Sequence, residues 1–457
     1  MRPATAAVHL PADTALWPRF AAFLGPLVLT NVLQALSGTF NSVFLGQMLG
    51  AQALAAAVAF FPVLMFLFAF VIGLGSGASI LVGQAWGGRQ EAKVREIAGA
   101  VLLGGLLAGA AIAMAGALVV GPLLRTLGTP AEVLPGAVGY ARVMMLSLPV
   151  LFTSMLAAAL LRGLGDSVTP LRVLVVTCAT SAMLTPALIG GWTGLPPLGV
   201  ASAGWATLAA NLLSLAWLGG RLARTGHLLA PGALRQQLRW RPDILRQVGR
   251  LGLPPGLFFV ASSLADIGLL SLVNRHGAEA VAAWGAAHQV TAYVQFPAMS
   301  IAIAASVLAA QAIGAGRAEE IHRVTRVGLA LNLVLTGSLA VAVVLFAPHA
   351  VRVFTSDPAV VRLGTQLLYV SVWGSLLVGL GSVFSGVMRA AGTVRVPMLI
   401  SLACIAFLQF PVGWLLERRG GVPALWFTYL VTYGCGASLQ AAYYLLVWRR
   451  RPVHKLA

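Results

Sequence analysis

Twelve long apolar runs divide this chain, and they limit its possible folds more than any other feature. A helix that crosses a bilayer needs about 20 mostly apolar residues. The runs show no alternation of apolar and polar residues, which excludes the strands of a membrane barrel. The sequence therefore predicts an all-α integral membrane protein with twelve transmembrane helices, near residues 20–48, 52–82, 97–127, 138–162, 170–192, 197–222, 246–274, 280–312, 324–348, 362–388, 396–417 and 422–448.

The composition excludes several classes of protein. Hydrophobic residues make up 59% of the chain and charged residues only 9%, whereas soluble domains carry roughly 25% charged residues. A soluble enzyme, a nucleic-acid-binding protein and a disordered protein are therefore not expected. The three cysteines lie in apolar runs without the spacing of metal ligands, so we interpret them as core thiols.

The net charge of +18 lies in short tracts between the apolar runs. With twelve spans, 23 of the 30 Lys and Arg residues fall on one side of the membrane and 7 on the other. Cytoplasmic loops carry the excess of basic residues in membrane proteins. We therefore predict that both termini are cytoplasmic. The abundance of Arg and Ala indicates a GC-rich bacterial source, so the predicted location is a bacterial cytoplasmic (inner) membrane.

The second half of the chain repeats the first at an offset of 227 residues. Three blocks share this register: 50–56 with 277–283, 84–87 with 311–314, and Arg162, Gly165 and Pro170 with Arg389, Gly392 and Pro397. Each half holds an even number of spans, so both halves have the same orientation. This predicts two pseudo-symmetric six-helix lobes, related as a parallel repeat by an axis along the membrane normal. Such a pair of lobes suits a transporter that works by alternating access.

This repeat predicts five segments. They are an N-terminal lead (1–19), an N-lobe with spans one to six (20–222), a cytoplasmic linker (223–245), a C-lobe with spans seven to twelve (246–448) and a cytoplasmic tail (449–457).

Several motifs in the two halves resemble those of the multidrug and toxic compound extrusion (MATE) family. They are Phe44-Leu45-Gly46, Gly83-Gln84-Ala85-Trp86-Gly87, Leu161-Arg162-Gly163-Leu164-Gly165-Asp166, Gln311-Ala312-Ile313-Gly314-Ala315-Gly316-Arg317 and Met388-Arg389-Ala390-Ala391-Gly392. The resemblance covers about residues 20–448. It implies an antiporter with two six-helix lobes that exports organic cations or other amphiphiles, driven by inward H⁺ or Na⁺.

The chain departs from the family pattern at the carboxylates. Many members of the family carry an Asp in the first span, where this chain has Asn41, and an Asn and an Asp-Pro pair in the fifth span, where it has Ser181, Thr185 and Pro186. Another branch uses a Glu at the position that aligns with Ser262 and an Asp in the tenth span, which here holds no acid. The ion coupling of either branch therefore does not transfer directly, and coupling in the C-lobe is the alternative.

Asp266 is the one acid well inside an apolar run. An ionised Asp at the centre of a membrane helix costs about 2.5–3.5 kcal/mol on insertion scales, so its presence indicates a function. Apolar surroundings favour the neutral acid. Asp266 could therefore exchange a proton, bind Na⁺ or pair with a cationic substrate. A structural Asp that is hydrogen-bonded to Ser263 or to a neighbouring helix is the alternative.

Two polar stripes provide further candidates for the substrate and ion pathway. In the first span, Gln34 and Asn41 lie on one helical face with Asn31 and Gly38. These amides could line the pathway or could join helices by hydrogen bonds.

The eighth span carries the second stripe, formed by His288, Thr291 and Gln295, with Trp284 one turn earlier and Tyr293 nearby. His288 could relay protons, and the two aromatic rings could stack on an organic cation. Simple packing is the alternative for each of these side chains.

We therefore expect a cation-coupled antiporter, with H⁺ favoured over Na⁺, that exports organic cations or amphiphilic drugs. A lipid-linked saccharide flippase of a related branch is the alternative, although the spans hold almost no central Arg or Lys. A channel, receptor or enzyme lacks support, because neither a filter-like loop nor a nucleophile–base pair is present. The expected partners are a small-molecule substrate and membrane lipids but no nucleic acid, the expected state is a monomer, and no cofactor or metal is expected besides the coupling ion.

Overall fold

The structure is a computed structural model that describes residues 16–192, 194, 198–453, 455 and 456. These residues form helices and connecting turns, with no strand among them, and twelve helical segments are long and apolar enough to cross a membrane. The predicted all-α fold with twelve transmembrane helices is confirmed. Most of the predicted N-terminal lead and two residues of the tail lie outside the described residues.

The chain forms two compact units. Among the described residues, unit 1 contains 29–252 and unit 2 contains 16–28 and 253–456, each with the gaps given above. Both long helices at the start of a half, α1 and α8, run from one unit into the other. The predicted lobes start at 20 and 246, so the units divide these two helices differently.

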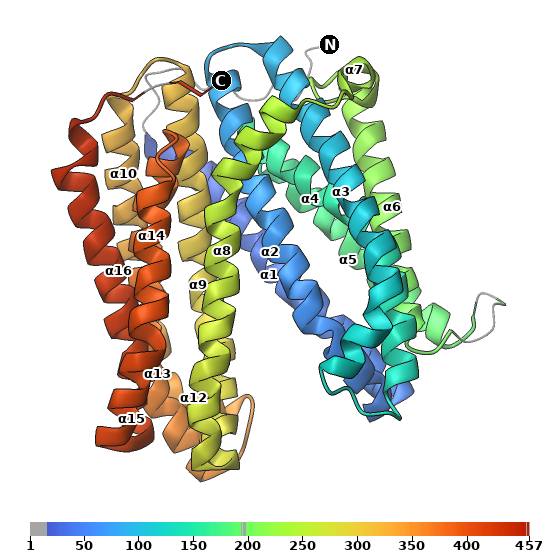
Figure 1. The fold of residues 1–457 in the computed structure, drawn as a ribbon, viewed down its shortest axis with the longest axis vertical. Coiled ribbons are helices and arrows are strands. Elements are labelled where there is room, and N and C mark those ends of the chain that lie inside the picture. Colours follow the sequence, from blue (N-terminus) through green and yellow to red (C-terminus); the bar gives the residue numbers. More distant parts are fainter. Residues whose placement is uncertain (1–15, 193, 195–197, 454, 457) are drawn as a thin grey trace. The chain divides into compact units, whose positions relative to one another are not determined.

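The helices of the first half, in chain order, are α1 (Leu16–Leu49), α2 (Ala51–Gly87), α3 (Glu91–Thr126), α4 (Leu134–Gly163), α5 (Val168–Ile189), α6 (Ala201–Arg224), α7 (Pro231–Leu234) and the short 3-10 turn η1 (Arg235–Gln237). In unit 1, α4 packs against α2, α3 and α6, and α5 packs against α6 (Figure 1).

The helices of the second half are α8 (Pro242–Val273), η2 (Asn274–His276), α9 (Ala278–Gly314), α10 (Glu320–Leu331), η3 (Asn332–Thr336), α11 (Gly337–Leu345), α12 (Ala347–Arg352), α13 (Pro358–Ala390), α14 (Arg395–Cys404), η4 (Ile405–Gln409), α15 (Phe410–Leu425), α16 (Phe427–Leu446) and η5 (Trp448–Arg450). In unit 2, α13 is the central helix and packs against α9, α16, α11 and α12. The segments η3 and η4 are π-helical turns inside the ninth and eleventh spans.

Small residues explain why the predicted linker and the start of α8 join unit 1. A Cβ atom on Gly77 of α2 would collide with the backbone oxygen of Val248, and one on Gly252 would collide with the backbone oxygen of Gly73. The helices therefore touch backbone to backbone, which only glycine permits. Within the linker, Arg241 forms an ion pair with Glu96 of α3 at 3.1 Å. The linker is thus packed on α3 at these points.

The backbone repeats with the offset seen in the sequence. Positive φ angles recur in pairs that are 227 residues apart: Gly50 (84°) with Gly277 (91°), Arg89 (56°) with Gly316 (77°), Gly165 (91°) with Gly392 (80°), and Gly194 (73°) with Gly421 (64°), the last at a kink within α15. Residues with a side chain rarely adopt such angles. Their shared register shows that the two halves turn the chain at equivalent places.

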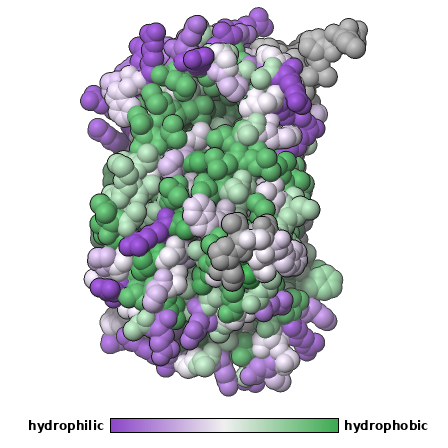
Figure 2. Space-filling view, turned by 90° about the vertical axis from the view of Figure 1, so that its right-hand side faces the viewer, coloured by the Kyte–Doolittle hydropathy of each residue, from purple (hydrophilic) through white to green (hydrophobic). Residues whose placement is uncertain are grey.

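The distribution of hydrophobic and hydrophilic residues on the surface is the one expected of a membrane protein. Figure 2 looks onto the side of unit 1 and shows hydrophobic residues across the middle, with hydrophilic residues gathered mainly at the two ends. Large apolar side chains such as Leu118 (82% exposed) and Met183 (74%) lie open on this unit. Lipid chains can cover such side chains at no cost, whereas water cannot.

Candidate functional site

Asp266 lies on α8, seven residues before the end of that helix, about 10 Å along its axis. Its carboxylate oxygen Oδ1 accepts a hydrogen bond from Nε2 of Gln409 at 3.0 Å and a longer one from the hydroxyl of Tyr429 at 3.5 Å. The side chain is partly buried inside unit 2. The seventh, eleventh and twelfth spans therefore meet at this one acid.

The partner amide belongs to the π-helical turn η4, where it is the last residue. Gln409 is fully buried, and its oxygen Oε1 has no hydrogen-bond partner. The extra residue in a π turn shifts the helix face, and such turns often lie at functional sites. Close to it, a Cβ atom on Gly268 of α8 would meet the ring of Phe410 at 2.9 Å. Glycine at this position thus lets α8 approach the π turn closely.

Aromatic side chains form one wall beside the acid. The rings of Tyr429 and Tyr433 on α16 lie 6.0 Å apart, and Trp284 of α9 lies beside Tyr429. Trp284 also stacks on His288, with ring centroids 4.9 Å apart and planes at 16°. A carboxylate next to several aromatic faces can attract an organic cation by charge and by cation–π contact.

The acid has no basic partner. Among the described residues, no Lys, Arg or His forms an ion pair with Asp266, and no group of three metal-ligating side chains is present. Just beyond the end of α8, in η2, His276 pairs with a different acid, Glu417, at 3.1 Å. Within the described part of the chain, neutral donors alone therefore stabilise the carboxylate, and no positive charge there cancels its charge.

Unit 1 has a neutral counterpart of this cross-link. The amide oxygen of Asn41 on α1 accepts hydrogen bonds from the hydroxyls of Ser181 at 3.4 Å and Thr185 at 3.3 Å, both on α5. The first and fifth spans of each half are thus joined by polar side chains. With the 227-residue offset, Ser181 aligns with the residue immediately before Gln409.

Two of the other predicted pathway residues, Thr291 and Tyr293, make contacts that do not involve the acid. Thr291 bonds to the backbone of Ala287 at 2.8 Å and approaches Ser371 at 3.5 Å. Tyr293 packs edge-on against Phe296, with ring centroids 5.7 Å apart. Neither contact leads to Asp266, so these two side chains lie further along α9.

Three predicted residues have no hydrogen bond that links them to the acid. Ser263 and Gln34 are exposed, and Gln295 is half-buried. The partners of Asp266 come from neighbouring helices and not from Ser263 on its own helix.

Sequence reasoning did not identify Gln409, Tyr429 and Tyr433. They lie more than 140 residues from Asp266 in the chain, and each sits in an apolar run where amides and tyrosines often only join helices. The available signal was the polarity of Gln409 in a run that otherwise reads as fully apolar, from Leu399 to Val412 apart from Ser401.

A twelve-span helical membrane protein with a duplicated six-span half and a polar site inside each half has the architecture of a secondary transporter. A family model described as MatE matches residues 26–187 and 256–415.

Curated relatives and solved structures agree with this assignment. The probable multidrug resistance protein YoeA of Bacillus subtilis is 34% identical, and the match covers 96% of both chains. A protein of Shewanella oneidensis named as an FAD transporter is 24% identical over 87% of each chain. The MATE transporter VcmN of Vibrio cholerae has the same fold, with a TM-score of 0.87, 21% identity, and coverage of 96% of this chain and 98% of that one.

The chain belongs to the multidrug and toxic compound extrusion family. It is a multi-pass bacterial membrane protein with the fold of a drug transporter, in a family whose members move small molecules and are not enzymes.

Proposed function

We propose that this protein is an antiporter that exports organic cations or amphiphilic drugs by alternating access, and that Asp266 couples export to the entry of a cation, H⁺ in preference to Na⁺. The observation that carries the proposal is the carboxylate of Asp266, held between three spans by neutral donors and without a basic partner. An uncompensated negative charge in a membrane helix must be neutralised before the surrounding helices can rearrange. A bound proton or a cationic substrate can each supply that neutralisation, so the two compete for one group.

The donors around the acid favour H⁺ over Na⁺. Both groups that reach Oδ1 are hydrogen donors, an amide N–H and a phenol O–H. A sodium ion needs several oxygen lone pairs directed at it, whereas a proton needs only one acceptor. The free oxygen of Gln409 offers a further fit: when Asp266 is protonated, a turned amide can accept its O–H.

The surroundings of the acid favour a flat cationic cargo. Tyr429 bonds to the carboxylate, and Trp284 and Tyr433 lie beside Tyr429, so a cation bound to the acid would be close to aromatic rings. The name of the Shewanella relative gives FAD as its cargo, and a negatively charged dinucleotide would be repelled by an ionised Asp266 that no Lys or Arg offsets. We therefore infer a positively charged or neutral substrate for this chain.

We infer a monomer in the cytoplasmic membrane with both termini in the cytoplasm, surrounded by membrane lipids, and with no cofactor besides the coupling ion. The excess of basic residues on one side supports the orientation.

Transport by the Asp266→Asn variant tests the proposal. The purified protein is reconstituted in liposomes, and exchange of ethidium is followed under an imposed pH gradient or an imposed Na⁺ gradient. We expect the wild type to respond mainly to the pH gradient. Asp266→Asn keeps the hydrogen bond from Gln409 but cannot ionise, so gradient-driven transport should fall to the level of empty liposomes.

The matched control is Asp243→Asn, which removes an exposed acid from the first turn of the same helix and should leave transport unchanged. Wild-type transport by Asp266→Asn would overturn the role of this acid. A response to the Na⁺ gradient alone would overturn the choice of H⁺.

A further inference from the structure

A cavity of about 410 Å³ lies in unit 2, between α12 with the loop that follows it and the first three turns of α13. This volume is in the range of pockets that bind small ligands. The cavity lies at the end of the unit opposite to the start of α10 and the end of α16 (Figure 1). Neither Asp266 nor its partners Gln409 and Tyr429 line it, so the cavity is a site separate from the one proposed for coupling.

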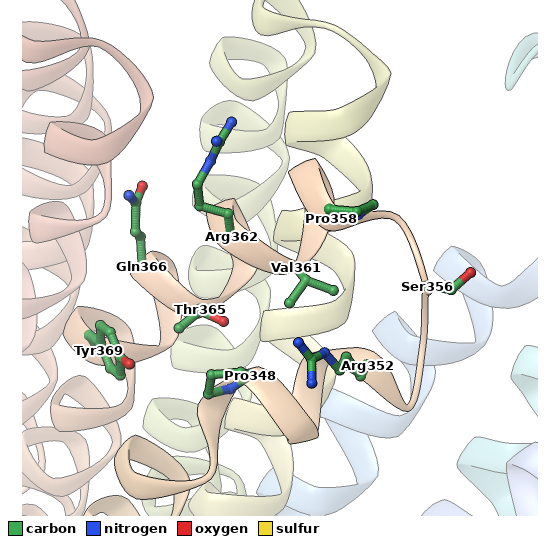
Figure 3. A pocket seen from close by; sticks show the side chains of 9 residues that line it. All are labelled: Pro348, Arg352, Ser356, Pro358, Val361, Arg362, Thr365, Gln366 and Tyr369. Atoms are coloured by element: carbon green, nitrogen blue, oxygen red, sulfur yellow. The ribbon is translucent and has the colours of Figure 1, made fainter.

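The lining is basic and rich in hydrogen-bond donors. It includes Arg352 and Arg362, together with Ser356, Thr365, Gln366 and Tyr369. Figure 3 shows Arg362, Thr365 and Gln366 on α13 and Arg352 on the facing segment. Guanidinium groups bind phosphate oxygens through paired hydrogen bonds. The cavity thus has the chemistry of a site for a phosphate ester.

Neither arginine is neutralised within the described part of the chain. No acid there forms an ion pair with Arg352 or Arg362. The acid next to the cavity in sequence, Asp357, instead caps α13 by accepting a hydrogen bond from the backbone N–H of Ala359 at 2.8 Å. Two positive charges therefore remain available to an anion.

A buried hydroxyl points to the same ligand independently. Thr365 is only 9% exposed, yet its Oγ1 has no hydrogen-bond partner. Figure 3 shows this oxygen turned toward the side of the cavity on which Arg352 lies. Buried hydroxyls are normally paired, so a ligand oxygen in the cavity would complete the hydrogen bonding of this group.

Exposed apolar side chains border the basic lining. Phe346 and Val353, which flank α12, are 63% and 80% exposed, and Phe354 is also open. A short helix with apolar flanks and charged residues is typical of the membrane interface. A free phosphate ion would gain nothing from these side chains, whereas the glycerol and acyl chains of a lipid would pack on them.

We propose that this cavity binds the headgroup of an acidic phospholipid. Arg352 and the Thr365 hydroxyl bind the phosphate, and the apolar flanks of α12 contact the acyl chains. Arg362, whose guanidinium points away from these two groups in Figure 3, attracts the anion by its charge. Given the predicted orientation of the spans, this lipid belongs to the leaflet on the non-cytoplasmic side.

Native mass spectrometry of the detergent-solubilised full chain tests the site, with dioctanoyl phosphatidylglycerol and dioctanoyl phosphatidylcholine as probes. We expect the wild type to retain phosphatidylglycerol in preference to phosphatidylcholine. Loss of both charges in Arg352→Gln/Arg362→Gln should weaken that retention by roughly tenfold or more. Thr365→Val, which keeps the shape of the side chain, should weaken it by a smaller factor and serves if the double variant does not fold.

The control is Arg275→Gln/Arg419→Gln, which removes two exposed arginines that do not line the cavity and should retain the lipid. Equal retention of both lipids by the wild type, or equal loss in the control and the cavity variant, would overturn the proposal. Displacement of the lipid by inorganic phosphate at matched concentration would show a free-anion site and would also overturn it.

Discussion

Asn41 carries an amide whose surroundings would suit a carboxylate equally well. Two hydroxyls, from Ser181 and Thr185, already direct their hydrogens at Oδ1 of Asn41. A carboxylate at this position would receive the same two donors. Replacing the amide nitrogen of Asn41 by an oxygen would therefore be enough to place an ionisable group between α1 and α5.

We predict that Asn41→Asp retains transport and makes its rate depend more steeply on pH, because a second titratable acid then lies within a helix pair. Initial rates of ethidium transport in liposomes between pH 5.5 and 8.5, a range chosen around neutrality, measure the effect. Asn211→Asp, at another buried amide of unit 1, is the matched control and should leave the steepness unchanged. An unaltered pH profile for Asn41→Asp would mean that Asn41 only joins α1 to α5.

The two π turns, η3 and η4, each contain one buried amide side chain. Asn332 opens η3 and is fully buried; it donates to the backbone oxygen of Leu376 at 3.0 Å and accepts from Thr336 at 3.0 Å. A Cβ atom on Gly379 of α13 would overlap the Asn332 amide. The π turn η3 and this glycine therefore depend on each other.

We predict that Gly379→Ala lowers the free energy of unfolding by about 1–3 kcal/mol, the usual cost of overpacking a core. Thermal unfolding can be followed with a thiol-reactive fluorophore, because all three cysteines are at least half-buried in the folded chain. Gly285→Ala, at a helical glycine of α9 with open space around it, should be neutral or slightly stabilising. Equal stability of the two variants would contradict the packing argument.

The sequence predicted the spans well because length and apolar composition alone decide whether a helix can cross a bilayer. It also singled out Asp266, since a charge in an apolar run has few explanations. It could not locate η3 or η4, because an inserted residue leaves the apolar content of a run unchanged. The partners Gln409 and Tyr429 were missed because identifying them requires knowing which helices are neighbours. A helix that is apolar on every side gives no sequence signal for the face that contacts another helix.

The distribution of basic residues predicts how the protein is oriented in the membrane, and this orientation can be tested by labelling. In a chain whose three native cysteines are replaced by alanine, we predict that Glu132→Cys reacts with a membrane-impermeant maleimide added to intact cells. Thr225→Cys should react only after the cells are opened. Both positions are exposed, in the loops after α3 and α6, so accessibility to solvent does not separate them. The reverse labelling pattern would contradict the predicted orientation.

The paired left-handed turns at Gly50 and Gly277, and at Arg89 and Gly316, have a consequence for the history of the chain. We interpret these shared turns as the result of a gene duplication, because the two halves keep the same backbone turns although most of their side chains differ. At the junction of its first and fifth helices, the second half carries an acid and the first half an uncharged amide, so the two halves have diverged in charge at equivalent places.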